Sequence, residues 1–512
     1  MSLALRPLTG NYRQDLALFE EALAAAGDIV YREIVLTLSE PVRACLIFTD
    51  TLVDHAEVNE HLLEPLLLPR PDAPQDTRGA WLSAHVLTMA EVSLVAEGEE
   101  IVRLILSGET ALLIEGECIL PVANTRGWAR RGVEEPPTEA VVRGPRVGLN
   151  EVFKNNIGQV RRWIRDPRLT VRVMTVGRRS KTDVAVLHLG GVADPRLVRR
   201  VEERLSRLDV DAVVDSTQLE EYLEDGPYSF FPTLLSTERA DRVVAALLEG
   251  RVSILADNSP SALIAPVSFW ELYHSAEDYY QRWTMGSFLR LLRFVALGVA
   301  LFLPGVFLAL ANFNPELLPF RLTMSMAASR AALPFPLLLE MLAMEFGIEL
   351  LREASVRLPG PFSATIGIVG GFILGDAAVR AGLTNSSLTV VVALTAVASF
   401  TAPSFGATTA VRLLRFAFTI AAGFYGFFGL ALGAVLLLWH LGNQRSFGRP
   451  YLSPFVPLRA GELKDSLVRL PFWTMVTRPG SLEPADLVRQ RRAMRYWWRA
   501  FRRPPGRRGD RG

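Results

Sequence analysis

Apolar residues are concentrated in the second half of the chain, and this distribution divides the sequence into two parts. Residues 294–311 form a run of 18 consecutive apolar residues. A helix of that length spans roughly 27 Å, which is close to the thickness of the hydrocarbon core of a bilayer. Further apolar stretches follow at 363–382, 388–405 and 416–441. The pattern predicts an α-helical transmembrane domain over residues 286–441 with about four spans.

Residues 1–285 contain no comparable stretch and carry the mixed charge of a water-exposed region. Arg282, Arg290 and Arg293 precede the first span, and positive charge beside a span favours the cytoplasmic side. The opening residues lack the apolar core of a secretory signal. We therefore expect the N-terminal region to be cytoplasmic, and an even number of spans returns the C-terminal tail to the same side.

Two pairs of similar segments indicate a duplication in the N-terminal region. Residues 44–54 and 184–194 share an apolar strand, a turn and an aspartate, at an offset of 140. Residues 107–117 and 249–259 share a glycine, a short apolar strand and an acidic turn, at an offset of 142. Apolar strands alternate here with segments of helical periodicity, and this alternation is typical of α/β folds.

The duplication predicts two similar α/β cytoplasmic subdomains, at residues 1–142 and 143–285. In the second subdomain, residues 211–215 have the pattern of a short strand. The repeated Asp54 and Asp194 each stand where a helix begins, so we interpret them as helix N-caps in preference to ligand-binding residues.

Residues 333–353 are apolar enough to enter a membrane, yet they include Glu340, Glu345 and Glu349. The last two, with Glu353, recur every four residues and therefore share one face of a helix. Ionised groups in lipid usually face a bundle interior or water. We interpret the first three glutamates as candidate pore or gate residues. The alternative is an amphipathic or re-entrant helix at the membrane interface with its acids in water.

Glycines repeat every four residues in two parts of the apolar region. Gly367, Gly371 and Gly375 form one series, and Gly429 with Gly433 forms another. Small residues at this spacing let helix backbones approach closely, so these glycines are predicted helix-packing positions. The contact could lie within one subunit or between subunits.

An acidic residue, Asp376, directly follows the first glycine series. A carboxylate inside an apolar segment is a functional candidate, and we include it among the candidate pore or gate residues. The alternative is a structural role in capping a short loop near Arg380.

The formal net charge of +1 conceals an asymmetry between the body and the tail. Residues 442–512 hold 16 Lys and Arg against 5 Asp and Glu, which gives +11 for the tail and −10 for the remainder. Tyr496, Trp497 and Trp498 lie among the arginines near the end. Aromatic rings and guanidinium groups suit the lipid headgroup layer, so we expect this basic cytoplasmic tail to contact membrane lipid and not nucleic acid.

Residues with catalytic or ligand-binding chemistry form no motif in the sequence. Cys45 and Cys118 cannot form a disulfide framework, and the six histidines are scattered. Phosphate-binding, dinucleotide-binding, zinc-protease and nucleophile-elbow motifs are absent from the sequence. We therefore expect no enzyme activity, no cofactor and no bound metal.

Four longer stretches have a distinctive sequence. They read RGPRVGLNEVFKNNIGQVRRWIRDPRL at 143–169, LLEGRVSILADNSPSALIAPVSFWE at 247–271, PFPLLLEMLAMEFGIELLREASVRLP at 334–359 and SFGRPYLSPFVPL at 446–458. In residue identity, order and spacing they resemble the A subunits of GerA-type spore nutrient germinant receptors, and the resemblance extends over about residues 12–458. The last stretch contains the family motif, made up of Ser446, Phe447, Gly448, Pro450, Tyr451 and Pro454.

The resemblance implies a multi-pass protein of the spore inner membrane that acts with a transporter-like B subunit and a lipoprotein C subunit. It also implies a homo-oligomer that forms the ion-conducting part of a nutrient-gated channel, whose opening starts germination. The alternative is a non-conducting scaffold or signal transducer that couples the B subunit to the germination machinery. A channel needs water-facing acids around an axis, whereas a scaffold would leave those acids paired or at an interface.

Overall fold

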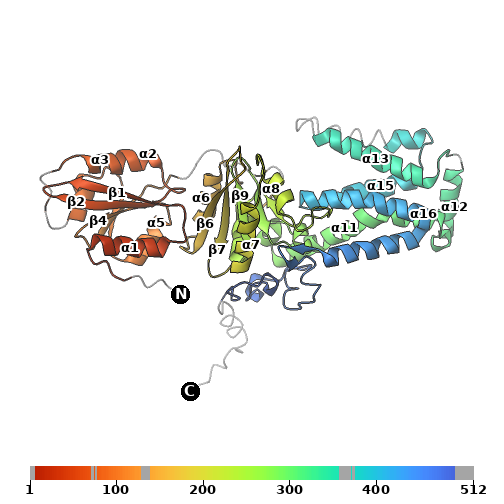
Figure 1. Cartoon of the computed structure of the whole chain (residues 1–512). Helices are drawn as coiled ribbons and strands as arrows, with labels where there is room; N and C mark the ends of the chain where they lie inside the picture. The colour runs from red at the N-terminus through yellow and green to blue at the C-terminus, as the bar shows by residue number, and fades with distance from the viewer. Residues whose placement is uncertain are drawn as a thin grey trace, which may run out of the picture. The chain divides into compact units, whose positions relative to one another are not determined.

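The computed structural model describes residues 6–70, 74, 78–127, 136, 139–331, 333–356, 371 and 375–490, and these form two compact units (Figure 1). The first unit comprises residues 6–224, 234–266 and 475–490. The second comprises Asp225–Thr233 and Val267–Thr474. The first unit is an α/β region and the second is mainly helical, as the sequence predicts. Residues 267–474 group with the helices, whereas residues 475–490 group with the α/β region.

The first subdomain is a five-stranded antiparallel sheet in the order β1-β2-β4-β5-β3, with helices on both faces. Its elements are α1 (Tyr12–Leu23), β1 (Ile29–Thr37), β2 (Pro41–Thr49), α2 (His55–Val58), the π-helical turn η1 (Asn59–Leu63), α3 (Glu64–Leu67), α4 (Arg78–His85), β3 (Val92–Val95), α5 (Gly98–Ile105), β4 (Thr110–Ile114) and β5 (Leu120–Ala123).

The alternation of side chains along β2 builds two separate cores in this subdomain. Cys45 and Ile47 face α1 and α5, whereas Leu46 and Phe48 face the helices from α2 to α4. Figure 1 shows α1 and α5 on one side of the sheet and α2 and α3 on the other. Because both faces are covered, β2 and β4 are apolar at nearly every position, which explains why the sequence shows continuous apolar runs here.

The second subdomain repeats this topology with the strand order β6-β7-β9-β10-β8. Its elements are α6 (Phe153–Trp163), β6 (Leu169–Val176), β7 (Thr182–Leu189), α7 (Pro195–Ser206), α8 (Ser216–Leu223), β8 (Leu235–Thr237), α9 (Ala240–Glu249), β9 (Val252–Ala256) and β10 (Ala262–Ala265). Strand for strand, β6 to β10 correspond to β1 to β5. The predicted pair of similar α/β subdomains is therefore confirmed.

The aspartates of the repeated segments cap helices, as predicted. The Asp54 carboxylate accepts a hydrogen bond from Ala56 N at 2.9 Å at the start of α2, and Asp194 accepts one from Arg196 N at 2.9 Å at the start of α7. The prediction of a strand at 211–215 is wrong. That segment forms no ladder, and it ends with Asp215, which caps α8 through Thr217 N at 3.0 Å.

A carboxylate in α8 makes the α/β unit sensitive to pH. Burial, followed by the nearby carboxylates of Glu224, Glu221 and Asp215, raises the pKa of Glu220 from 4.5 to about 7. The folded state therefore holds this proton more tightly than the unfolded state, and stability falls as the pH rises from about 4.5 to about 7. We expect Glu220→Gln to raise the stability at pH 8 by up to about 3 kcal/mol and to change little at pH 4. Thermal unfolding of parent and variant at both pH values checks this, and an equal shift at both would contradict it.

The second unit is built around long apolar helices. Its elements are the 3-10 turn η2 (Phe269–Tyr273), α10 (Glu277–Tyr280), α11 (Trp283–Asn312), the turn η3 (Pro315–Leu317), α12 (Phe320–Arg330), α13 (Leu337–Val356), α15 (Ser386–Ser399), α16 (Phe405–Asn443), β11 (Arg445–Ser446), β12 (Arg449–Pro450) and the turn η4 (Phe472–Thr474). Among the described residues, α11 and α16 are long and apolar enough to cross a membrane. At 14 residues α15 is about 21 Å long, which is shorter than a bilayer core. The span expected at 363–382 lies mostly outside the described residues.

The helix α16 reverses direction at Gly426, whose φ of 59° and ψ of −139° are not helical. In a straight helix Phe418 and Gly433 would be about 22 Å apart. Instead, a Cβ added to Gly433 would lie 2.8 Å from the Phe418 ring, and one added to Gly429 would lie 2.2 Å from the Ala421 carbonyl oxygen. The expected single span at 416–441 is therefore replaced by a hairpin of two antiparallel legs, residues 405–425 and 427–443 (Figure 1).

The chain after α16 is partly folded into both units. Arg290, near the start of α11, is fully buried and pairs with Asp278 at 3.3 Å and with Asp465 at 2.8 Å. The 3-10 turn η5 (Gly480–Leu482) belongs to the α/β unit, where Arg478 Nε donates to Leu248 O at 2.7 Å. The described part of the basic tail is thus bound to the folded protein. The aromatic residues Tyr496–Trp498 lie outside the described residues.

Candidate functional site

The predicted pore residues Glu345 and Glu349 lie side by side on α13 and face the first leg of α16. Arg415 Nε is 3.6 Å from Glu345 Oε1, and Arg415 Nη2 is 3.7 Å from Glu349 Oε2. Arg412 forms a second ion pair with Glu349. The Glu345 and Arg415 side chains are only 1% and 3% exposed. We call these four residues the charged cluster.

The charged cluster lies well inside the helical bundle and not at its end. Arg412 and Arg415 are about 10 and 15 Å from the start of a leg that is about 31 Å long. Phe418, one turn further along this leg, belongs to the apolar core formed by α11, α13, α15 and α16. Charges at such a depth need partners, because removing an ion from water costs several kcal/mol even after relaxation.

A third guanidinium extends the polar interior towards α15. Arg352 Nη2 donates to Ser399 Oγ at 2.7 Å, and its guanidinium carbon lies 4.3 Å from the centre of the Phe400 ring. Two carboxylates therefore face two arginines of α16, with a further arginine on the next turn of α13. The sequence pattern identified the acids, but it did not predict their pairing with Arg412 and Arg415, which lie more than 60 residues further along the chain.

The other two candidate pore residues have different surroundings. Glu340 is 2% exposed, and its carboxylate oxygens make no hydrogen bond to any described residue. Asp376 pairs with Arg380 at 2.8 Å, where the two side chains are 40% and 78% exposed. The structure thus brings Glu345 and Glu349 together, while Asp376 forms a local ion pair with Arg380 one helical turn away.

The predicted packing glycines differ in what they contact. Gly429 and Gly433 lie where the two legs of α16 meet, so their packing is within one chain. A Cβ on Gly375 would make ordinary contact with Thr389 at 3.4 Å, and one on Gly371 would meet no described atom within 4 Å. Gly367 lies outside the described residues.

Because their surroundings differ, we expect leucine at Gly433 and leucine at Gly371 to affect different properties of the protein. Gly433→Leu should destabilise the chain itself by about 1–3 kcal/mol, because the side chain would collide with Phe418. Gly371→Leu should leave the monomer fold unchanged and weaken helix packing between copies of the chain. Thermal unfolding and native mass spectrometry of detergent-solubilised protein separate the two effects. An unchanged oligomer and unchanged germination for Gly371→Leu would show that this glycine faces lipid.

The family motif forms a junction at the end of α16. Ser446 Oγ donates to Thr233 O at 2.6 Å and accepts from Val267 N at 3.0 Å, while Tyr451 Oη donates to Pro232 O at 2.8 Å. Phe447 and Gly448 make the tight turn between β11 and β12, with φ values of 48° and 77°. The remaining motif residues, Pro450 and Pro454, follow this turn. The motif therefore joins α16 to the segments 225–233 and 267–273.

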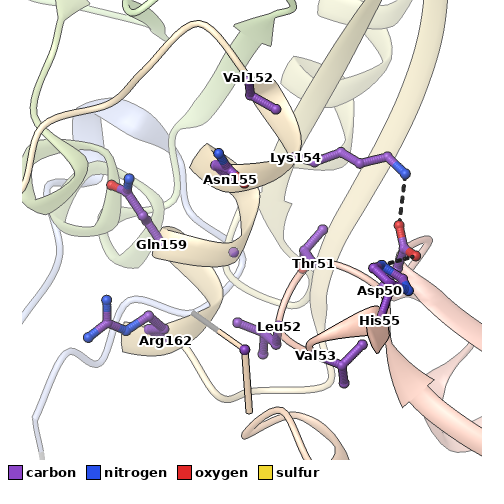
Figure 2. A pocket seen from close by; sticks show the side chains of 12 residues that line it. Asp50, Thr51, Leu52, Val53, His55, Val152, Lys154, Asn155, Gln159 and Arg162 are labelled. Carbon is purple, nitrogen blue, oxygen red and sulfur yellow. Dashed lines mark hydrogen bonds and ion pairs between the residues drawn. The ribbon is translucent and has the colours of Figure 1, made fainter. Parts of the chain in front are cut away.

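A separate cavity of about 280 Å³ lies between the two α/β subdomains, where the loop after β2 meets α6 (Figure 2). Lys154 Nζ lies 2.9 Å from Asp50 Oδ2, and His55 Nε2 lies 3.3 Å from Asp50 Oδ1. Arg162 and Gln159 of α6 also line it. Sequence reasoning missed this cavity, because its walls come from segments about 100 residues apart and share no motif.

A buried ion pair holds the subdomains together beside this cavity. Arg161 is fully buried, and its Nε and Nη2 lie 3.0 and 2.5 Å from the two carboxylate oxygens of Asp28. The same Nη2 donates to Leu169 O at 3.1 Å. Gly158 approaches the Thr51 carbonyl so closely that a Cβ would lie 2.4 Å from it.

These features define a class of protein in which a duplicated α/β domain is joined to an apolar helical bundle with a buried charged cluster. Residues 17–481 match the family model for the Bacillus/Clostridium GerA spore germination protein. The chain belongs to this family of germinant receptor A subunits, which confirms the resemblance found in the sequence.

Several individual proteins are similar to the chain over most of its length. Spore germination protein KA of Bacillus subtilis (strain 168) is 35% identical over 94% of this chain and 89% of its own. Spore germination protein GerLA of Bacillus cereus is 35% identical over 94% of this chain and 98% of its own length. The crystal structure of the N-terminal domain of the A subunit of the Bacillus megaterium spore germinant receptor GerK3 covers 52% of this chain and 98% of that domain, with 26% identity and a TM-score of 0.41.

Proposed function

We propose that the helical unit crosses the spore inner membrane and that, as a homo-oligomer, it forms a nutrient-gated ion path. In this proposal the chain acts with a transporter-like B subunit and a lipoprotein C subunit, and it has no catalytic role. The outer surface of the bundle supports a membrane location. Large apolar side chains such as Val295, Phe424 and Phe428 are 64%, 65% and 70% exposed, as expected for helices covered by lipid or by neighbouring copies.

The observation that carries the proposal is the charged cluster. Two glutamates and two arginines occupy the interior of a largely apolar bundle, at a depth where uncharged residues of similar size would cost less. Ionisable groups in membrane-spanning segments commonly mark ion pathways and gates. A cluster of this kind is expected in a protein that moves charge.

The pairing of the cluster suggests how the path is closed. Glu345 and Glu349 are each paired with an arginine of α16, so within one chain neither carboxylate is open to water. A movement of α13 relative to α16 would separate the pairs and expose the carboxylates, and a ring of carboxylates from several copies would then attract cations. The cluster would thus serve as a gate in the closed form and as a cation site in the open form.

The scaffold alternative is favoured by the same pairing. Acids that stay paired in every state would hold α13 against α16 and would transmit movement without conducting ions. The two functions differ in one measurable property, which is the flux of ions across a membrane. Reconstitution of the purified assembly in liposomes, with a potassium-sensitive dye to record flux upon nutrient addition, tests the proposal.

A further inference from the structure

The segment Asp225–Thr233 leaves the α/β unit between α8 and β8 and is held against the last turn of α16. Ser229 Oγ lies 3.0 Å from His440 Nε2 and donates to Gln444 Oε1 at 3.1 Å. Gln444 Nε2 in turn donates to Phe231 O at 3.1 Å. These bonds hold the segment at the level of the end of α16.

Two aromatic side chains of this segment point away from the protein. Tyr228 is 97% exposed and Phe230 is 55% exposed. They flank Ser229, whose bonds to α16 hold the backbone between them. Such a well-anchored pair of exposed rings is unusual, because apolar surface is normally withdrawn from water when the fold allows it.

The neighbouring residues have the character of a membrane interface. Trp439, one residue before His440, is 69% exposed. Arg445 is exposed two residues after α16 ends at Asn443. Tyrosine and tryptophan prefer the headgroup layer, where one part of the ring system meets apolar chains and another meets water, and arginine binds phosphate.

The size of the patch argues for lipid and against a protein partner. An aromatic side chain offers roughly 150–250 Å², so these two rings offer at most about 500 Å². A stable protein interface needs about 800 Å² on each partner. Insertion into lipid has no such minimum, because each ring gains its own contact with the acyl chains.

We propose that the segment 226–231 inserts Tyr228 and Phe230 into the boundary between headgroups and acyl chains of the bilayer that α16 crosses. The segment that joins α8 to β8 would thereby gain a direct contact with the membrane, next to the family-motif junction. This inference rests on the proposed function, since it requires α16 to lie in a bilayer.

The test places an environment-sensitive fluorophore at position 228 of the full chain. Because Tyr228 is almost fully exposed, Tyr228→Cys removes no described contact. Cys45 is buried and Cys118 is exposed, so Cys118→Ser restricts labelling to the new cysteine. The labelled protein is reconstituted in vesicles of phosphatidylglycerol and phosphatidylethanolamine. Quenching is then measured with spin labels near the carbonyl end of the acyl chains and with aqueous iodide.

Two labelled controls make the outcome specific. The parent chain labelled at Cys118 reports a water-exposed site, and Leu436→Cys with Cys118→Ser reports the second leg of α16, where Leu436 is 55% exposed. We expect lipid quenching at 228 to exceed that at 118 by about three-fold or more, and iodide quenching to be lower by a similar factor. A label at Phe230→Cys should behave like the label at 228.

Each other outcome has a distinct meaning. Lipid quenching at 436 without quenching at 228 would overturn this inference and leave the membrane location of α16 intact. Protection of 228 from iodide without lipid quenching would also overturn it, because a protein surface would then cover the rings. Absence of lipid quenching at 436 would contradict the proposed membrane function itself, and the inference would fall with it.

Discussion

Replacing both Glu345 and Glu349 with glutamine is expected to reduce nutrient-triggered potassium flux in liposomes by at least about ten-fold, because carboxylates concentrate cations in a pore. The same change leaves the buried Arg415 and the half-buried Arg412 without counter-charges. Loss of one side of a buried ion pair typically costs about 3–5 kcal/mol, so the variant should also unfold more easily. Flux and thermal unfolding are measured on the same preparation.

A fourfold variant separates the two effects. Adding Arg412→Gln and Arg415→Gln removes the uncompensated charges and should restore most of the stability without restoring flux. Glu353→Gln is the matched control, because Glu353 is exposed on the same helix and should tolerate neutralisation. If the fourfold variant assembles and conducts like the parent, the glutamates have only a structural role.

The second large effect is expected at the buried ion pair between the α/β subdomains. Arg161→Leu leaves Asp28 buried without its guanidinium partner, so we expect the interface to lose about 3–5 kcal/mol. Hydrogen exchange of the full chain in detergent should show the loss as faster exchange in α6 and in residues 26–30. Combining Asp28→Asn with Arg161→Leu should recover part of the lost interface stability, because no buried charge then remains unpaired.

The neighbouring pair between Lys154 and Asp50 provides the comparison. The Lys154 side chain is 61% exposed, and exposed pairs contribute at most about 1 kcal/mol. Lys154→Ala should therefore change the exchange rates little. Equal effects of Arg161→Leu and Lys154→Ala would mean that the subdomains are held together by other contacts.

The α/β region could be predicted from the sequence because its signals are local. A strand covered on both faces is a continuous apolar run, and a helix that follows a strand begins with a capping aspartate, so Asp54 and Asp194 revealed the repeat. The wrong prediction of a strand at 211–215 also came from a local apolar pattern. Val213 is buried, but the segment leads into the cap of α8 and finds no neighbouring strand, and apolar character alone cannot distinguish the two situations.

The helical unit was less predictable, because hydropathy shows how apolar a segment is and does not show where its helix reverses direction. Two antiparallel legs of α16 have the same apolar character as one long span, and the reversal depends on the backbone of the single residue Gly426. Likewise, Glu345 and Glu349 could be recognised as unusual, but their arginine partners are set by the packing of α13 against α16. Long-range pairing of this kind leaves no mark in the local pattern.

Ion flux through the purified receptor assembly, reconstituted in liposomes with its partner subunits, is the most direct measurement. The structure and the charged cluster lead us to expect potassium flux that begins on nutrient addition and is lost in the Glu345→Gln, Glu349→Gln variant while assembly is preserved. An intact, nutrient-responsive assembly that passes no ions would contradict a conducting role and would identify the chain as a scaffold.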